Sequence, residues 1–145
     1  MSDSTDFEQR LQAIRAHDQR EREIRNYNEP LLAEWQAWLA HEGLAAKKIA
    51  RYRSNVRLFS MYLTTYAPLR PLDEATSADV SRFLSYWYPR KVMGATPTGV
   101  VSHYASFKWL FRWLGEAGRA SPERVAAVAS VLKQRRAEFL AAVTK

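Results

Sequence analysis

The sequence predicts an all-α protein, a compact bundle of four to five helices preceded by a charged helical extension. Apolar residues recur at steps of three and four along most of the chain, the spacing of one face of an α-helix. No segment keeps up the alternation of apolar and polar residues that is typical of a half-buried strand. With 145 residues, 47% of them hydrophobic, the chain is long enough for one packed domain.

The chain is predicted to divide into a charged helical extension, residues 1–26, and a domain, residues 27–145. Residues of opposite charge stand four apart along the extension, which favours a solvated helix; they are Asp6/Arg10, Asp18/Arg22 and Glu21/Arg25. Asn28 followed by Pro30 predicts a new helix start, because Asn caps helices and Pro is tolerated in the first turn.

Four further helices are predicted in order. Residues 45–66 carry a stripe at steps of three and four, formed by Ile49, Tyr52, Val56, Phe59, Leu63 and Tyr66. Thr76-Ser77-Ala78-Asp79 predicts the start of a third helix, with an acid in its first turn. A fourth begins near Thr96-Pro97 and extends to residue 116, and Ser121-Pro122-Glu123 caps a last one.

Basic residues are concentrated in the middle of the chain. Residues 43–115 contain eleven basic and three acidic residues, a net charge of +8, whereas residues 1–42 carry −4. Between Glu42 and Asp73 there is no acidic residue at all. Packing does not require such a block, and its commonest cause is a polyanionic partner.

Signs of an enzyme or a metal site are missing from the sequence. There is no cysteine and no glycine-rich phosphate loop, and the three histidines are too far apart to form a ligand pair on one helix. Asp73-Glu74 is predicted only to solvate a loop. We therefore expect no catalytic residue, no metal and no cofactor. A polar N-terminus and the lack of a long apolar run predict a cytoplasmic protein, nucleoid-associated if bound to DNA, with no membrane partner.

Two helices are candidates for binding the phosphates of a nucleic acid. The candidate residues are Lys47, Lys48, Arg51, Arg53 and Arg57 on the first, Arg90 and Lys91 in the following loop, and His103, Lys108 and Arg112 on the second. The simpler alternative is a solvated charged face. Trp109 and Trp113 are also predicted to lie outside the core, either covered by the last helix or exposed for a protein partner.

Residues 28–120 resemble the N-terminal core-binding domain, a SAM-like helical domain, of tyrosine recombinases and phage integrases. The runs that carry the resemblance are Leu39–Leu44 with Lys48–Tyr52 and Leu58–Leu63, Leu72–Val80 with Phe83 and Leu84, and Lys108–Leu114 with Glu116–Gly118. The resemblance implies a domain that clamps double-stranded DNA with its second and fourth helices, here residues 45–66 and 97–116. It also implies self-association, or a separate catalytic recombinase, as a further partner.

The sequence departs from that family in its catalytic part. The family's Arg, H-x-x-R and Tyr follow the core-binding domain, and residues 121–145 here contain neither a His nor a Tyr. The one H-x-x-R, at His17 and Arg20, precedes the match, and Ser121-Pro122 replaces the usual Asn-Pro. We therefore expect a non-catalytic module that binds double-stranded DNA. The alternative is a helical protein-interaction module on the same scaffold that no longer binds DNA.

Overall fold

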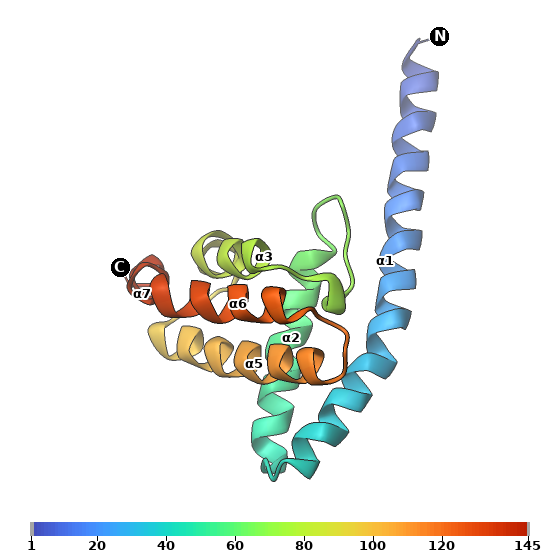
Figure 1. The fold of residues 1–145 in the computed structure, drawn as a ribbon. Helices are drawn as coiled ribbons and strands as arrows, with labels where there is room; N and C mark the ends of the chain where they lie inside the picture. The colour runs from blue at the N-terminus through green and yellow to red at the C-terminus, as the bar shows by residue number, and fades with distance from the viewer. Residues whose placement is uncertain (1, 145) are drawn as a thin grey trace.

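The computed structural model describes residues 2–144, and every regular element within this range is helical. The elements are α1 (Ser2–His41), α2 (Ala46–Leu63), η1 (Leu72–Glu74), α3 (Ser77–Arg82), η2 (Phe83–Trp87), α4 (Tyr88–Lys91), α5 (Pro97–Glu116), α6 (Pro122–Gln134) and α7 (Arg136–Ala142). Figure 1 shows α2 to α7 gathered into one body, with α1 along one side of it. The predicted all-α class is confirmed.

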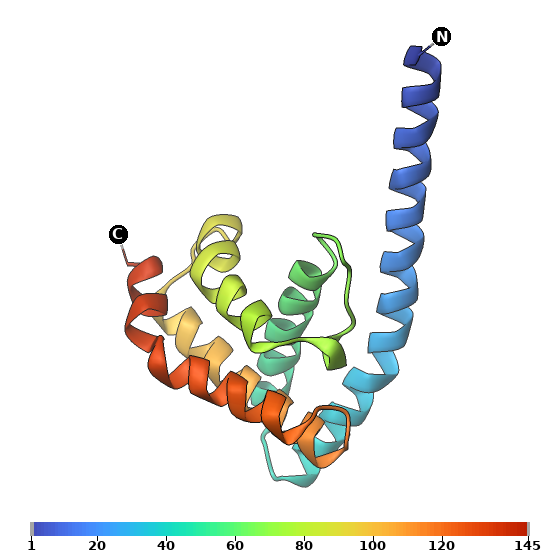
Figure 2. The ribbon, with the colours of Figure 1, turned by 45° about the horizontal axis from the view of Figure 1, so that its top comes forward.

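Helix α1 is a single element whose first half projects away from the body (Figures 1 and 2). From residue 3 onward, the first fully buried side chain is that of Ile24. Beyond it, Leu31, Trp35 and Leu39 lie in the core. Only the second half of α1 is therefore part of the bundle.

The predicted helix start at Asn28 is wrong, because α1 continues through Asn28 and Pro30. Pro30 has no N–H to donate to the carbonyl of Asn26, a loss that usually costs about 3 kcal/mol inside a helix. Asn26 and Pro30 both lie on the exposed side of α1, where water can hydrate the free carbonyl. This placement makes the proline tolerable within the helix.

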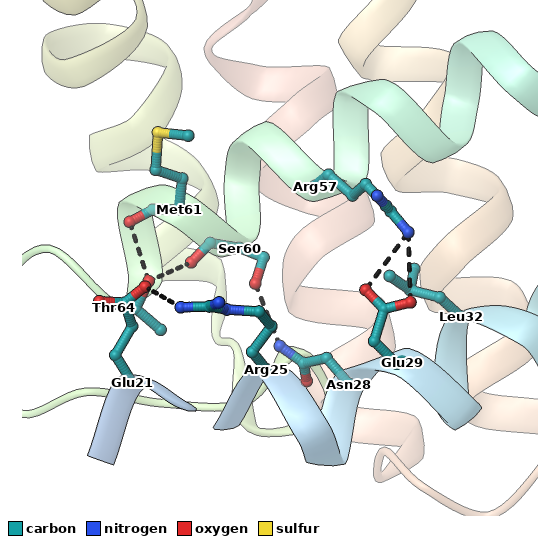
Figure 3. A pocket seen from close by; sticks show the side chains of 9 residues that line it. All are labelled: Glu21, Arg25, Asn28, Glu29, Leu32, Arg57, Ser60, Met61 and Thr64. Atoms are coloured by element: carbon teal, nitrogen blue, oxygen red, sulfur yellow. Dashed lines mark hydrogen bonds and ion pairs between the residues drawn. The ribbon is translucent and has the colours of Figure 1, made fainter. Parts of the chain in front are cut away.

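Asn28 instead joins three segments of the fold. Its side chain is 3% exposed, and its Nδ2 donates a hydrogen bond to Oγ of Ser60 in α2, at 3.0 Å. Its Oδ1 accepts a hydrogen bond from the backbone N–H of Leu72 in η1, at 3.1 Å. The bond to Ser60 is drawn in Figure 3. Both ends of the buried amide are thus satisfied.

Aromatic rings from three segments fill the centre of the body. The ring of Phe59 in α2 lies edge-to-face with Phe107 of α5, at 4.8 Å between centroids, and with Phe83 of η2, at 5.4 Å. All three side chains are almost fully buried. Edge-to-face contacts stabilise such clusters beyond the area that they bury, so these rings fix the crossing of α2 and α5.

The predicted starts of α3, α5 and α6 are confirmed by their caps. Thr76 forms a capping box with Asp79, since the Thr76 hydroxyl accepts from the Asp79 N–H while the Asp79 carboxylate accepts from the Thr76 N–H. Thr96 and Ser121 each accept a hydrogen bond from the backbone N–H three residues later. Polar caps at these positions stabilise a helix by about 1 kcal/mol each.

Asp73 does more than solvate a loop, so that expectation is wrong for this residue, although Glu74 is exposed. The buried Asp73 carboxylate accepts hydrogen bonds from Oη of Tyr27, at 2.6 Å, and from Arg119, at 3.3 Å. Arg124 donates to the backbone oxygen of Asp73, at 2.6 Å. The residue thereby fastens η1 to α1 and to the start of α6.

Candidate nucleic-acid interface

Helix α2 carries five basic residues and no acidic residue along its 18 residues. Its first residues are capped by Ala45, which offers no side-chain hydrogen bond. Lys47 and Lys48 stand in the first turn, where the helix dipole is positive and acids are favoured. Cations at this end repel the positive end of the helix dipole and destabilise the helix. The positive potential at the start of α2 is therefore high, and a bound anion would lower it.

Three of the four cations in the first half of α2 are exposed and, in the described part of the chain, unpaired. Lys47, Lys48 and Arg51 are exposed, and among residues 2–144 none of their side chains has an ion-pair or hydrogen-bond partner. Acids three or four residues away would compensate such cations on a helix, and α2 contains no acid. We name Lys47, Lys48 and Arg51 the α2 cation cluster.

Arg53 and Arg57 face a different direction, toward α1. Arg57 donates to both carboxylate oxygens of Glu29, each at 3.2 Å, as Figure 3 shows. Arg53 is half-buried and lines a hollow with Gln36 of α1, and its Nε has no hydrogen-bond partner in the part of the chain that the structure describes. The charge of Arg57 is compensated within the protein, so it contributes less to binding an anion than the α2 cation cluster does.

Helix α5 exposes two of its predicted cations, Lys108 and Arg112, and both line a hollow between α5 and α6. Lys108 is exposed without an ion pair among the described residues, and Arg112 forms an i,i+4 pair with Glu116 at 3.4 Å. The Arg112 guanidinium also lies over the rings of Trp38 and Trp109, at 5.6 and 5.3 Å from the centroids. Cation–π contacts of this kind hold the side chain in place, while Glu116 compensates part of its charge.

The outer faces of α2 and α5 adjoin one another. Nδ2 of Asn55 in α2 donates to Oγ of Ser102 in α5, at 2.9 Å. Asn55 lies one turn beyond Arg51 on the same side of α2. This contact between residues 47 positions apart in the sequence could not be predicted from local patterns.

His103 is not part of this surface, and its predicted place outside the core is wrong. It is 3% exposed and lies against the rings of Tyr88, at 4.7 Å, and Phe83, at 5.3 Å. Its Nδ1 is buried without a hydrogen-bond partner among the described residues. Burial lowers the pKa of His103 to about 4, because the charged imidazolium would lose its hydration. The side chain is neutral at physiological pH.

The buried His103 is expected to make the protein less stable as the pH falls below 6.5. The unfolded imidazole gains a proton near pH 6.5, whereas the folded one resists it until about pH 4. Stability is therefore full above pH 6.5 and decreases by about 2 kcal/mol by pH 5. Urea unfolding of the protein and of a His103→Phe variant at pH 7, 6 and 5 measures this, and the variant should show the flatter dependence. Equal slopes for the two proteins would contradict the assignment.

The two tryptophans of α5 do not form an exposed pair. Trp113 is buried, and Trp109 is half-buried with its ring edge-to-face to that of Trp38, at 5.7 Å. The prediction that both lie outside the core is therefore wrong for Trp113. Helix α5 contacts α1, α2, α6 and α7, so its buried face is wider than a single stripe.

Arg90 and Lys91 lie apart from the α2 cation cluster. Both are exposed at the end of α4, in a hollow shared with Ala142 and Val143 near the C-terminus. The Arg90 guanidinium lies over the ring of Tyr86, at 4.2 Å. Of the predicted site residues, Lys47, Lys48 and Arg51 lie together at the start of α2, whereas Lys108 and Arg112 of α5 line a hollow between α5 and α6.

Comparisons with known proteins add nothing to this geometry. No known protein family matches the chain, and neither a curated protein nor a solved structure does. Among the described helices, none combines the length and the apolar character needed to cross a membrane. The candidate interface therefore stands on its residues alone.

Proposed function

We propose that this chain is a non-catalytic module that binds double-stranded DNA through the first half of α2 and the outer face of α5. The observation that carries the proposal is the α2 cation cluster, three exposed and unpaired cations on a helix without a single acid. The resemblance of residues 28–120 to recombinase core-binding domains points to the same two helices. The resemblance covers the core-binding domain and not the part of the family that carries the catalytic Arg, H-x-x-R and Tyr. The proposal is therefore limited to DNA binding and does not extend to strand cleavage.

Electrostatics gives the expected mode of binding. Lys and Arg that meet phosphates release condensed counterions, which makes the affinity depend steeply on salt. Asn55 and Ser102, which bond to one another between the two helices, offer polar groups beside the cations. Contacts to phosphates position a protein on the duplex but carry no sequence information. We therefore propose binding that depends mainly on phosphate contacts.

A titration of the full chain against a labelled duplex of about two helical turns tests the proposal. The fluorescence anisotropy of the DNA should rise with protein concentration, and log K should fall linearly with log salt. Five phosphate contacts, from Lys47, Lys48, Arg51, Lys108 and Arg112, correspond to a slope of roughly −4.5. A protein that gives no response even below about 100 mM salt would contradict the proposal.

The second candidate, a helical protein-interaction module, is favoured by one specific observation. Between α5 and α6 lies an apolar hollow, lined among others by Phe111, Val125, Ala129 and Leu132. Hollows of this kind accept apolar side chains of a partner. The same titration separates the two candidates, because this module would leave the anisotropy unchanged at every salt concentration.

A further inference from the structure

The projecting half of α1 carries an apolar row that nothing in the described part of the chain covers. Phe7 and Ile14 are 65% and 58% exposed, and Leu11 stands between them. Steps of four and three place these side chains on one face of the helix. Figures 1 and 2 show from two directions that this part of α1 stands clear of the body.

A helix in this position has little internal support. Most helices in proteins owe their stability to packing of an apolar face, and isolated ones are marginal in water. The ion pairs along this part of α1 are Arg25–Glu21 at 2.8 Å, Arg20–Glu23 at 3.5 Å and His17–Asp18 at 3.9 Å, and all of them involve residues 17–25 rather than the apolar row. Surface pairs of this kind contribute little. The apolar row is the feature that a partner would cover.

The charged residues beside the apolar row discriminate between a parallel and an antiparallel partner helix. With Leu11 as position a of a heptad, Phe7 and Ile14 take position d, and these three residues form the seam. The flanking positions are e, with Glu8 and Arg15, and g, with Asp3 and Arg10. In a parallel pair of identical helices, each g residue faces the partner's e residue five positions later. That arrangement opposes Asp3 to the partner's Glu8, and Arg10 to the partner's Arg15, so all four contacts are repulsive.

In an antiparallel pair the g residue Arg10 faces the partner's Arg10 or His17, which adds no attraction, whereas e residues face e residues. Glu8 of each copy comes beside the partner's Arg15, and both contacts are attractive. The acidic first turns, with Asp3, Asp6 and Glu8, lie alongside the more basic stretch from residue 10 onward. These charges therefore favour antiparallel over parallel pairing of two copies of the chain.

We propose that the tip of α1, residues 3–18, binds a second copy of the chain as an antiparallel helix pair with Phe7, Leu11 and Ile14 in the seam. Asp18 takes the next seam position and ends the apolar row, so the dimer is short, weak and reversible. The Glu8–Arg15 contacts set its direction. This association requires no DNA, and it is measured without DNA.

Sedimentation velocity of the full chain, from micromolar to near-millimolar concentration, tests the seam. The dimer fraction should rise with concentration, and a Phe7→Ala/Leu11→Ala/Ile14→Ala variant should stay monomeric. Alanine keeps the helix, and the row does not touch the body, so the melting temperature of the body serves as a folding control. Gln9→Ala, on the opposite face of the helix, should dimerise normally. A wild-type protein that is monomeric throughout, or a triple variant that dimerises equally well, would overturn the proposal.

A charge exchange tests the direction of the pair at low salt. Glu8→Arg and Arg15→Glu should each weaken the dimer several-fold, and the two changes together should restore it, because each copy regains its opposite charges. In a parallel pair Glu8→Arg would relieve repulsion from the partner's Asp3 and would tighten the dimer. Tightening by Glu8→Arg, or no response to either single change, is the result that rejects the antiparallel arrangement.

Discussion

Exchanging Lys47, Lys48 and Arg51 together for glutamine is expected to weaken binding to duplex DNA by roughly 100-fold near 100 mM salt. Each phosphate contact contributes about 0.9 to the slope of log K against log salt, so the slope should become shallower by roughly three units. The effect is large because these side chains are exposed and have no acid on their own helix to compensate them. Anisotropy titrations of both proteins over a salt series measure the affinity and the slope.

A second triple variant separates a defined surface from general attraction by net charge. Arg22, Lys91 and Lys133 are also exposed and without an ion pair among the described residues, but they lie on α1, α4 and α6. Changing them to glutamine removes the same three charges from the formal +7 of the chain. This control should lose far less affinity. Equal losses in the two variants would mean that the first half of α2 is not the binding surface.

Replacing Asn28 by alanine is expected to reduce the free energy of unfolding by about 3 kcal/mol. The change removes two buried hydrogen bonds and leaves the N–H of Leu72 without an acceptor in a region closed to water. For a chain of this size the melting temperature should fall by roughly 10 °C. Urea unfolding and a thermal melt followed by circular dichroism measure both quantities.

Asn26 supplies a matched control, because it is the same residue type in the same helix but exposed. Asn26→Ala should leave stability unchanged or raise it by a few tenths of a kcal/mol, since alanine is the better helix former. If Asn28→Ala and Asn26→Ala unfold at the same denaturant concentration, then Asn28 does not join α1 to α2 and η1 as the structure indicates.

The sequence predicted those elements whose ends are marked by local chemistry. Thr76, Thr96 and Ser121 are side-chain caps, and all three begin a helix where expected. The predicted stripe holds within α2, where Tyr52, Val56, Phe59 and Leu63 are buried, but the helix ends at Leu63 and Tyr66 beyond it is exposed. The α2 cation cluster could be identified from charge alone, since the absence of acids in α2 is visible without a structure.

The sequence-based predictions are wrong where contacts between residues far apart in the sequence determine the structure. The residues Asn28 and Pro30 look like a helix start, and only the exposure of Pro30 and the buried partners of Asn28 explain why the helix continues. His103 and Trp113 lie off the main apolar stripe of α5, but neighbours on several sides bury them. Asp73 binds Tyr27, 46 residues away in sequence. None of these contacts leaves a local trace in the sequence.

Because α1 is one continuous helix, its free end is a helical extension of the body rather than a flexible linker. At 1.5 Å per residue, the part before Ile24 spans roughly 30 Å, and pairing of its apolar row would keep it helical at that length, where a flexible linker would fluctuate. Whatever binds the tip is consequently held at a set distance and direction from the body. If the helix ended at residue 27, a flexible linker would join the tip to the body. The linker would then set only the effective concentration of a bound partner near the body, and not its position. The unbroken helix therefore acts as a spacer of defined length between the body and a partner bound at the tip.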